Sequence, residues 1–350
     1  MKKEKIISTV IFVIIFILFA IFFSKDYLDF QENLFKKSEQ EQLVLKEAEE
    51  FNVSKIENLE NADLKIAPDE KILSNFVEKL DKAEKNIYIE VYMLTEKRIT
   101  ESLKKARNRW VDVKVLLEKS PYKTENINNK VFEELKDAWV NVTWSNEKNY
   151  YLNHSKFFVI DDLLIASTWN LTYSTFTVNR DFFFYSSDVK LLQTVKNIFE
   201  NDFNWKKVDF YHNNLIMSPN YSRIKLEKYL KSATKNIKIY IQYLKDKKIN
   251  NSLLALKKEK NIDIEIIIDK KNLEDESVDE ILKNAWIKIK WFDWKTMHSK
   301  AILIDEKYLF IGSINFSEFS IDKNREFWVF LKEENLIKNF LEIFEKDFWN

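Results

Sequence analysis

Two stretches of this 350-residue chain, HSKFFVID at residues 154–161 and HSKAILID at residues 298–305, decide its fold. Both have the pattern His-x-Lys-x4-Asp, and together they contain two of the chain's three histidines. Because lysine is abundant in this chain, one such match means little, but two matches in register indicate a repeated motif. The pattern predicts a chain built from two copies of one unit.

The repeat extends beyond these motifs. Downstream, Ser167-Thr168-Trp169-Asn170 matches Gly312-Ser313-Ile314-Asn315, and Asn179-Arg180-Asp181 matches Asn324-Arg325-Glu326. In each copy, amphipathic helical patterns alternate with apolar, β-branched runs that are typical of buried strands. We therefore expect two α/β lobes related by a pseudo-two-fold axis, each with a largely parallel or mixed sheet.

The repeated His and Lys residues indicate phosphate chemistry. Residues i and i+2 of a strand face the same side, so His154 projects with Lys156, and His298 with Lys300. An imidazole beside an ammonium group provides a nucleophile or an acid together with positive charge for an anion. Two facing half-sites would supply one histidine to attack phosphorus and another to protonate the leaving oxygen. We expect one active site between the lobes, with no metal and no cofactor.

Four acidic residues near these motifs are further candidates for the catalytic site. Asp181 and Glu326 are expected to fix the imidazole tautomers by accepting a hydrogen bond from the far ring nitrogen. Asp161 and Asp305 end the two motifs and are also counted as catalytic candidates. The alternative for this second pair is that each carboxylate serves the turn after its strand.

On these motifs the chain resembles the phospholipase D superfamily, whose members carry two HxKxxxxD motifs, each followed by a GSxN-like segment and a later acidic residue. The resemblance covers roughly residues 66–350 and implies a pseudo-two-fold pair of lobes and a covalent phosphohistidine intermediate. It implies that His154 and His298 act as nucleophile and general acid, without deciding which is which. The phosphate ligands that it implies are Lys156, Lys300, Asn170, Asn315, Thr168 and Ser313.

The first copy departs from the family pattern in two places. Ser167-Thr168 replaces the usual Gly-Ser, and Asp181 is one methylene shorter than the usual glutamate. Both changes keep hydrogen-bonding capacity, so we expect an active enzyme. A structural role for both His-Lys pairs is the alternative, and the matching downstream residues argue against it.

Composition excludes several classes of site. The chain has no cysteine, which excludes disulfides, thiolate zinc sites and cysteine nucleophiles. Its single glycine excludes dinucleotide-binding fingerprints and Walker-type phosphate loops. The 56 basic residues balance the 56 acidic ones, which argues against a generally basic nucleic-acid binder.

The N-terminus reads as a membrane anchor over residues 1–23. Residues 6–23 carry no charge, and three lysines precede them while acidic residues follow. This pattern predicts one transmembrane helix with a cytoplasmic N-terminus and the lobes on the non-cytoplasmic side of the cell membrane. A cleaved signal peptide is the alternative, but the apolar run is long and lacks a small-residue cleavage site.

The rest of the chain divides into three expected parts. Residues 24–66 contain neither Gly nor Pro and favour a helical stalk, with a solvated disordered linker as the alternative. Residues 67–211 and 212–350 are the two expected lobes. Since both lie in one chain, no obligate dimer is needed.

The motifs predict the reaction type but leave the substrate open. The expected anchor places the site near a phospholipid surface and favours a lipid headgroup. A nuclease is the alternative, and net neutrality with few arginines weighs against it, because tracking a nucleic-acid backbone usually needs a basic stripe. A membrane-tethered binding module without activity is a third possibility, against which the intact paired motifs argue.

The scarcity of glycine suggests a hypothesis about the tryptophans. Trp110, Trp139 and Trp286 each follow a predicted helix and precede a strand, which is a position usually filled by glycine in a left-handed conformation. A left-handed tryptophan would cost about 1–2 kcal/mol. Trp294 stands in a short loop where a turn residue is expected. We hypothesise that these residues are glycines in the cell, encoded by UGA; a genuinely tryptophan-rich protein is the alternative.

Overall fold

A computed structural model of the protein describes residues 41–207, 210–270, 281–293 and 296–349. The expected membrane anchor lies outside these residues, as does the first part of the expected stalk. Residues 41–49 are helical. Within the part of the chain that the structure describes, no helix is long and apolar enough to cross a membrane.

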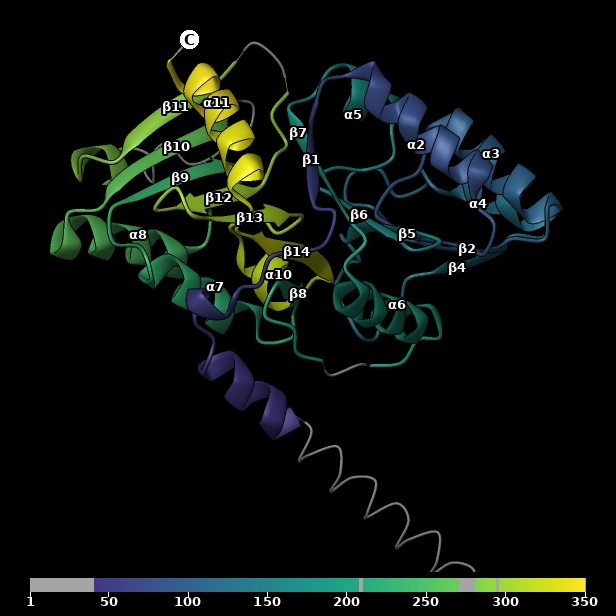
Figure 1. The fold of residues 1–350 in the computed structure, drawn as a ribbon, viewed down its shortest axis with the longest axis horizontal. Helices are drawn as coiled ribbons and strands as arrows, with labels where there is room; N and C mark the ends of the chain where they lie inside the picture. The colour runs from purple at the N-terminus through teal and green to yellow at the C-terminus, as the bar shows by residue number, and fades with distance from the viewer. Residues whose placement is uncertain (1–40, 208–209, 271–280, 294–295, 350) are drawn as a thin grey trace, which may run out of the picture. The chain divides into compact units, whose positions relative to one another are not determined.

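The first lobe is an α/β unit built on a seven-stranded sheet (Figure 1). The N-terminus of its first helix is capped by Asp69, whose carboxylate accepts a hydrogen bond from the Lys71 amide at 2.9 Å. A short 3-10 helix over Val53–Lys55 precedes the lobe. Its elements are β1 (Asp63–Ala67), α2 (Glu70–Lys82), β2 (Asn86–Val91), α3 (Lys97–Asn108), β3 (Asp112–Leu117), α4 (Asn129–Asp137), β4 (Asn141–Trp144), β5 (Lys156–Ile160), β6 (Leu163–Ser167), α5 (Tyr173–Thr177), β7 (Asp181–Ser186) and α6 (Val189–Phe203).

The second lobe repeats this order of elements. Its helices and strands follow one another as in the first lobe, although residues 271–280 between β10 and β11 lie outside the described part. Its elements are β8 (Leu215–Ser218), α7 (Ser222–Lys231), β9 (Asn236–Ile241), α8 (Lys247–Lys260), β10 (Asp263–Asp269), β11 (Lys288–Phe292), β12 (Ala301–Ile304), β13 (Tyr308–Gly312), α10 (Glu318–Asp322), β14 (Glu326–Leu331) and α11 (Glu334–Trp349).

Both sheets are mixed and have the same topology. The strand orders are β1-β7-β6-β5-β2-β3-β4 and β11-β10-β9-β12-β13-β14-β8, which are the same order read from opposite edges. In each sheet two neighbouring pairs are parallel (β2 with β3 and β3 with β4; β9 with β10 and β10 with β11), and the other pairs are antiparallel. The prediction of two repeated α/β lobes with mixed sheets is confirmed.

The first sheet begins earlier than the sequence indicated. Strand β1 pairs antiparallel with β7 and starts at Asp63, inside the segment assigned to the stalk. Phe51 and Ile56, also in that segment, are buried in the hydrophobic cluster that contains α7 and α8 of the second lobe. The physical reason is that these apolar residues are removed from water by packing, which a free stalk would not allow.

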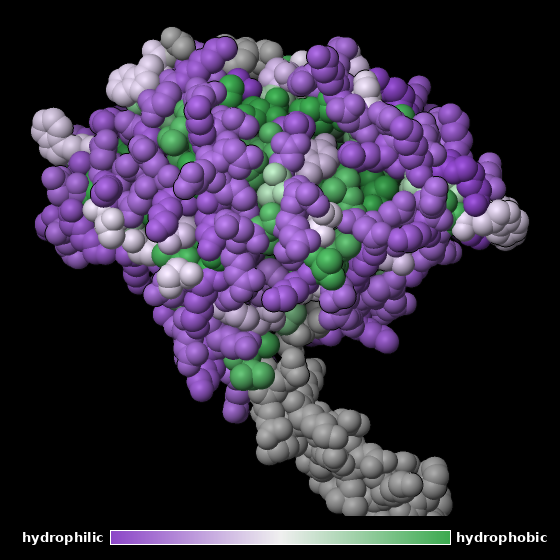
Figure 2. Space-filling model, viewed as in Figure 1, coloured by the Kyte–Doolittle hydropathy of each residue, from purple (hydrophilic) through white to green (hydrophobic). Residues whose placement is uncertain are grey.

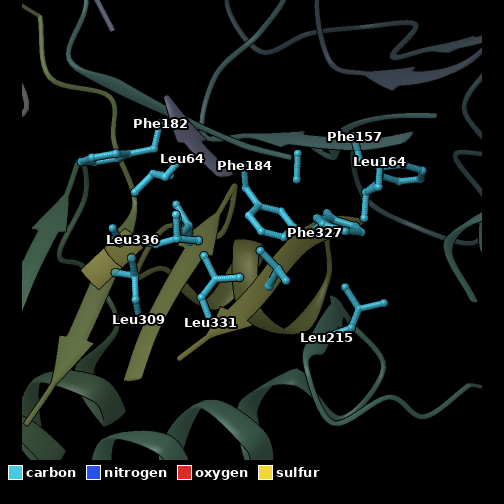
Figure 3. Close-up of a cluster of buried hydrophobic side chains, with 14 of the residues drawn as sticks. Leu64, Phe157, Leu164, Phe182, Phe184, Leu215, Leu309, Phe327, Leu331 and Leu336 are labelled. Carbon is cyan, nitrogen blue, oxygen red and sulfur yellow. The ribbon is translucent and has the colours of Figure 1, made fainter. Parts of the chain in front are cut away.

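The lobes meet through a shared hydrophobic core. Figure 3 shows this cluster, in which Phe157 and Phe184 of the first lobe lie near Phe327 and Leu331 of the second. The Phe157 and Phe327 rings are 4.9 Å apart. Each fully buried phenylalanine contributes about 1.5–3 kcal/mol to stability. The outer surface, by contrast, is largely hydrophilic on the face seen in Figure 2.

Two ion pairs cross between the lobes in opposite directions. Arg180 of the first lobe donates to Asp347 in α11 at 2.7 and 3.1 Å. Arg325 of the second lobe donates to Asp202 in α6 at 2.7 Å. All four side chains are buried. Since a buried charge without its partner is costly, the pairs fix how the two lobes dock.

Candidate active site

The structure brings the two repeated histidines together between the lobes. His154 lies just before β5 and His298 just before β12, and their ring centroids are 6.4 Å apart. Lys156 and Lys300 are fully buried beside them. Two imidazoles at this separation are close enough for both rings to contact one bound phosphodiester.

The carboxylate that orients His154 comes from the opposite lobe. His154 Nδ1 lies 2.8 Å from Glu326 Oε2, and Glu326 is the first residue of β14. The other oxygen of Glu326 accepts hydrogen bonds from Ser320 Oγ at 2.7 Å and Asn324 Nδ2 at 3.3 Å. Because a carboxylate only accepts, Nδ1 of His154 carries the proton and Nε2 keeps a free lone pair.

His298 has different partners. Its Nδ1 lies 2.7 Å from Lys300 Nζ and 3.2 Å from the Thr168 carbonyl oxygen. Asp181, the repeat partner of Glu326, accepts a hydrogen bond from Thr168 Oγ1 at 2.7 Å. The other oxygen of Asp181 has no hydrogen-bond partner among the described residues. The shorter side chain of Asp181 therefore bonds to its own lobe, and an orienting role toward His298 is not seen.

Burial controls the protonation of both half-sites. Burial lowers the pKa of His154 to about 4, although the Glu326 carboxylate opposes this effect. Burial also lowers the pKa of Lys156 to about 7. The pKa of His298 is lowered well below its usual value by burial and by Lys300. Burial raises the pKa of Asp181 to about 8, so this carboxyl group is protonated at neutral pH. Both imidazoles are then neutral at pH 7.

The cations of the site are lysines. Burial and the charge of Lys156 lower the pKa of Lys300, while Asp181 and Glu326 act in the opposite direction. A bound phosphate would raise the pKa of both ammonium groups. No group of three or more His, Asp or Glu side chains among the described residues could hold a metal ion. The expectation of a reaction without metal or cofactor stays a prediction.

Two asparagine side chains have unsatisfied amide groups at the site. The Oδ1 atoms of Asn170 and Asn315 are buried and have no hydrogen-bond partner within the described residues. Buried polar atoms are nearly always paired, and here the same atom lacks a partner in both lobes. An Oδ1 atom accepts hydrogen bonds, as do the oxygens of a phosphate, so these two residues would contact a phosphate through their Nδ2 groups; their role in phosphate binding stays a prediction.

The hydroxyl groups of the same motifs already have partners. Besides donating to Asp181, Thr168 Oγ1 accepts from the Phe182 amide at 3.0 Å. Ser313 Oγ accepts from the Phe327 amide at 3.0 Å. Each hydroxyl therefore ties its loop to the neighbouring strand. The only glycine, Gly312, precedes Ser313 in a position where an added Cβ would lie 2.1 Å from the Phe327 carbonyl oxygen.

The last aspartate of each motif lies away from the histidines. Asp161 follows the opposite end of β5 from His154, and its carboxylate accepts the backbone amides of residues 84–86 at 2.7–3.0 Å. Asp305 similarly accepts the amides of residues 234–236. Both have positive φ angles, 51° and 54°. Their assignment as catalytic residues is corrected: they hold the turns that lead into β2 and β9.

Two aromatic side chains at the site were not among the expected residues. The Tyr92 ring packs edge-on against His154 at 4.8 Å, and the Trp169 ring lies 3.6 Å from the His298 ring. Tyr92 directly follows β2 and aligns with Gln242 of the second copy, whose Oε1 accepts from Lys300 Nζ at 3.2 Å. Tyr92 and Gln242 occupy equivalent positions in the two copies, and this alignment could have identified them as candidate site residues from the sequence.

Comparison with known proteins agrees with these two lobes. The family model described as "Cardiolipin synthase, PLD-like domain" matches residues 76–203 and 226–349. No curated protein matches the chain.

Solved structures share the fold. Polyphosphate kinase from Porphyromonas gingivalis has a TM-score of 0.64 and 14% identity, covering 81% of this chain and 50% of the kinase. This chain thus spans half of the kinase's length. Phosphatidylserine synthase from Haemophilus influenzae Rd KW20 has a TM-score of 0.64 and 11% identity, covering 88% of this chain and 90% of the synthase. The phospholipase D family member Nuc from Salmonella typhimurium has 18% identity and a TM-score of 0.38, covering 43% of this chain and 99% of Nuc.

At these identities the structural likeness concerns the fold alone, whereas the family model matches most of the chain. Its two matched segments are the two lobes, and each contains one His-x-Lys-x4-Asp motif. The chain belongs to the family of the cardiolipin synthase, phospholipase D-like domain.

Proposed function

We propose that the protein is a phosphodiesterase or transphosphatidylase that acts on phospholipid headgroups through a phosphohistidine intermediate. The observation that carries this proposal is the pair of imidazoles, 6.4 Å apart, with a buried lysine beside each. Only one of the two rings bonds to a carboxylate from the opposite lobe. This arrangement supports one nucleophile and one proton donor.

In the first step His154 is the nucleophile. Its Nε2 lone pair attacks the phosphorus atom, and the bond from phosphorus to the leaving oxygen breaks. Glu326 stabilises the positive imidazole that forms, as the orienting carboxylate does in a serine triad. Lys156, Lys300 and the amide groups of Asn170 and Asn315 contact the non-bridging oxygens. The negative charge of the bound diester raises the pKa of His298, and the resulting imidazolium donates its Nε2 proton to the leaving alcohol, which leaves His298 neutral.

In the second step the phosphoryl group passes from His154 to the acceptor. Water or a second alcohol approaches phosphorus, and His298 removes its proton. The new phosphorus–oxygen bond forms while the bond to His154 Nε2 breaks, which returns both histidines to their starting states. Water as acceptor gives hydrolysis, and a lipid alcohol gives transfer.

Two observations support a lipid substrate. The matching family model bears the name of cardiolipin synthase, and the fold is similar to that of phosphatidylserine synthase. The apolar run at residues 6–23 supports a single-pass membrane protein with its lobes on the non-cytoplasmic side. An endonuclease is the alternative, since the same chemistry cleaves nucleic-acid diesters.

The test compares two substrates on the full-length chain. Labelled phosphatidylglycerol vesicles and labelled single-stranded DNA are incubated with the wild type, His154→Ala and His298→Ala. We expect headgroup release or transfer by the wild type only, with DNA intact. Cleavage of DNA alone would overturn the lipid substrate, and activity that survives both substitutions would overturn the mechanism.

A further inference from the structure

A buried carboxylate ends the equivalent strand of each lobe, close to the histidine. Glu118 directly follows β3, and Asp269 is the last residue of β10. Both side chains belong to residues that are 1% exposed. Neither contributes to the chemistry described above, and neither belongs to a repeated site motif.

Each carboxylate binds the backbone amide of the residue that precedes the histidine. Glu118 Oε2 accepts from the Asn153 amide at 2.6 Å, and Asn153 precedes His154. Asp269 Oδ2 accepts from the Met297 amide at 3.1 Å, and Met297 precedes His298. The same contact thus occurs in both lobes, although the side chains differ in length.

The opposite lobe holds the same two turns through the backbone. The His154 amide donates to the Arg325 carbonyl oxygen at 2.7 Å, and the Arg180 amide donates to the Thr296 carbonyl oxygen at 3.1 Å. Each histidine-bearing turn is therefore held from its own lobe by a carboxylate and from the other lobe by a peptide group. Opposed contacts of this kind fix the backbone from which the imidazole projects.

We propose that Glu118 and Asp269 are positioning residues that set the separation of the two imidazoles. The proposal rests on the two-histidine mechanism proposed above. A displacement of about 1 Å in a reacting group lowers the rate about 10²-fold, so loss of either contact should reduce turnover more than substrate binding.

The two carboxylates differ in how well an amide can replace them. Glu118 also accepts from Ser145 Oγ at 2.8 Å and, through Oε1, from the Ser120 amide at 2.9 Å. Because each oxygen of Glu118 accepts from a backbone N–H, a glutamine at this position would place its NH2 group against one of these N–H donors and lose that hydrogen bond. An asparagine at position 269 keeps an oxygen that can accept from the Met297 amide, and it removes the negative charge that raises the pKa of Lys300 in the wild type.

The experiment measures kcat and KM of the full-length chain with bis(p-nitrophenyl) phosphate, a phosphodiester that is independent of the natural substrate. We expect Glu118→Gln to lower kcat about 10²-fold with little change in KM, and Asp269→Asn to lower it less than tenfold. Glu265→Gln is the matched control: Glu265 is a buried carboxylate of β10 that pairs with Lys238 and Lys288. Its kcat should equal the wild-type value for the folded fraction.

The histidine side-chain ¹⁵N signals give a second readout. Glu118→Gln should shift the signal of His154 and leave that of His298 in place. Wild-type kcat in a folded Glu118→Gln chain, or a loss confined to KM, would overturn the positioning role. Absence of any turnover by the wild type would instead overturn the proposed function.

A second, independent inference concerns four tryptophans with left-handed backbones. Trp110, Trp139, Trp205 and Trp286 have φ angles of 68°, 59°, 60° and 63°. Three of them are 82–85% exposed and Trp205 is 52% exposed, so their rings gain little from packing. Asn261, the repeat partner of Trp110, has the same conformation with a φ of 53°.

Each of these tryptophans completes the same helix-ending hydrogen-bond pattern. The Trp110 amide donates to the Arg107 carbonyl at 2.9 Å, and the next amide, of Val111, donates to the Ala106 carbonyl at 3.1 Å. The amides at 139 and 140, at 205 and 206, and at 286 and 287 make the equivalent pairs at 2.8–3.1 Å. This is the Schellman motif, whose left-handed residue is usually glycine.

We infer that these four positions are glycine in the protein made by its own cells, through UGA codons that those cells read as glycine. Three of the four were expected from the sequence, and Trp205 is added by the structure. Trp294 lies outside the described residues.

The codons and the native protein test this inference. We expect UGA at 110, 139, 205 and 286, and native peptides lighter by the tryptophan-to-glycine mass difference. In the tryptophan-containing chain, Trp110→Gly, Trp139→Gly and Trp286→Gly should each raise Tm by about 2–4 °C. Trp328→Gly is the control and should lower Tm, because Trp328 is fully buried against Phe310. UGG codons at the four positions, or lower Tm values for the three variants, would refute it.

Discussion

The two half-sites share a sequence pattern and differ in how their histidines are held. His154 bonds to a carboxylate from the opposite lobe, whereas His298 contacts the lysine of its own motif and a backbone carbonyl group. The carboxylates differ as well: Asp181 is one methylene shorter than Glu326 and accepts from Thr168 of its own lobe. A repeated motif can thus provide two different roles. The hydrogen-bond partner of Nδ1 differs between His154 and His298, and this partner determines which ring nitrogen carries the proton.

The sharpest way to break this comparison is to remove each imidazole in turn. His154→Ala and His298→Ala should both lower kcat about 10⁴-fold or more, because groups that act as a unit fail together. Only the chain that keeps His154 should form a phosphohistidine with a substrate that has a good leaving group. Acid-quench labelling with a ³²P-diester measures this intermediate, and a label on His154→Ala but not on His298→Ala would reverse the assignment.

Substitutions of Glu326 and Asp181 should have very different effects on kcat. Glu326→Gln leaves His154 without its anionic partner and should lower kcat about 10³-fold, in line with the tautomer control of a serine triad. Asp181→Asn should change kcat by less than about threefold at pH 7, because the raised pKa of about 8 already makes Asp181 neutral there. Equal losses in steady-state assays at matched folded fractions would show that the half-sites are equivalent.

The smallest expected effect is the pH dependence of kcat/KM. His154 stays neutral down to its lowered pKa, so activity should decline only below about pH 4. Lys156 loses its charge above its lowered pKa, so phosphate binding and kcat/KM should decline above about pH 7. Lys156→Arg should move the alkaline limb to higher pH, and an unchanged limb in this variant would assign it to another group.

Much of this arrangement could be predicted from residue patterns. The alternation of helices and strands, the duplication and the meeting of His154 with His298 all follow from local periodicity and repeated motifs. The crossed bond from Glu326 to His154 could not be predicted, because it depends on how the lobes dock. The same holds for Glu118, whose partner Asn153 lies 35 positions away. Asp161 and Asp305 were misassigned because a motif shows which residues recur and not which end of a strand they occupy.

The crossed pairs Arg180–Asp347 and Arg325–Asp202 have a consequence for assembly. The arginine of each lobe pairs with a carboxylate of the other lobe, so the two lobes make the same contact in both directions. This reciprocity is typical of an isologous dimer interface. The single chain is in this sense a tethered homodimer. Separating the lobes would break both ion pairs and expose the shared hydrophobic core to water, so each half depends on the other for its stability.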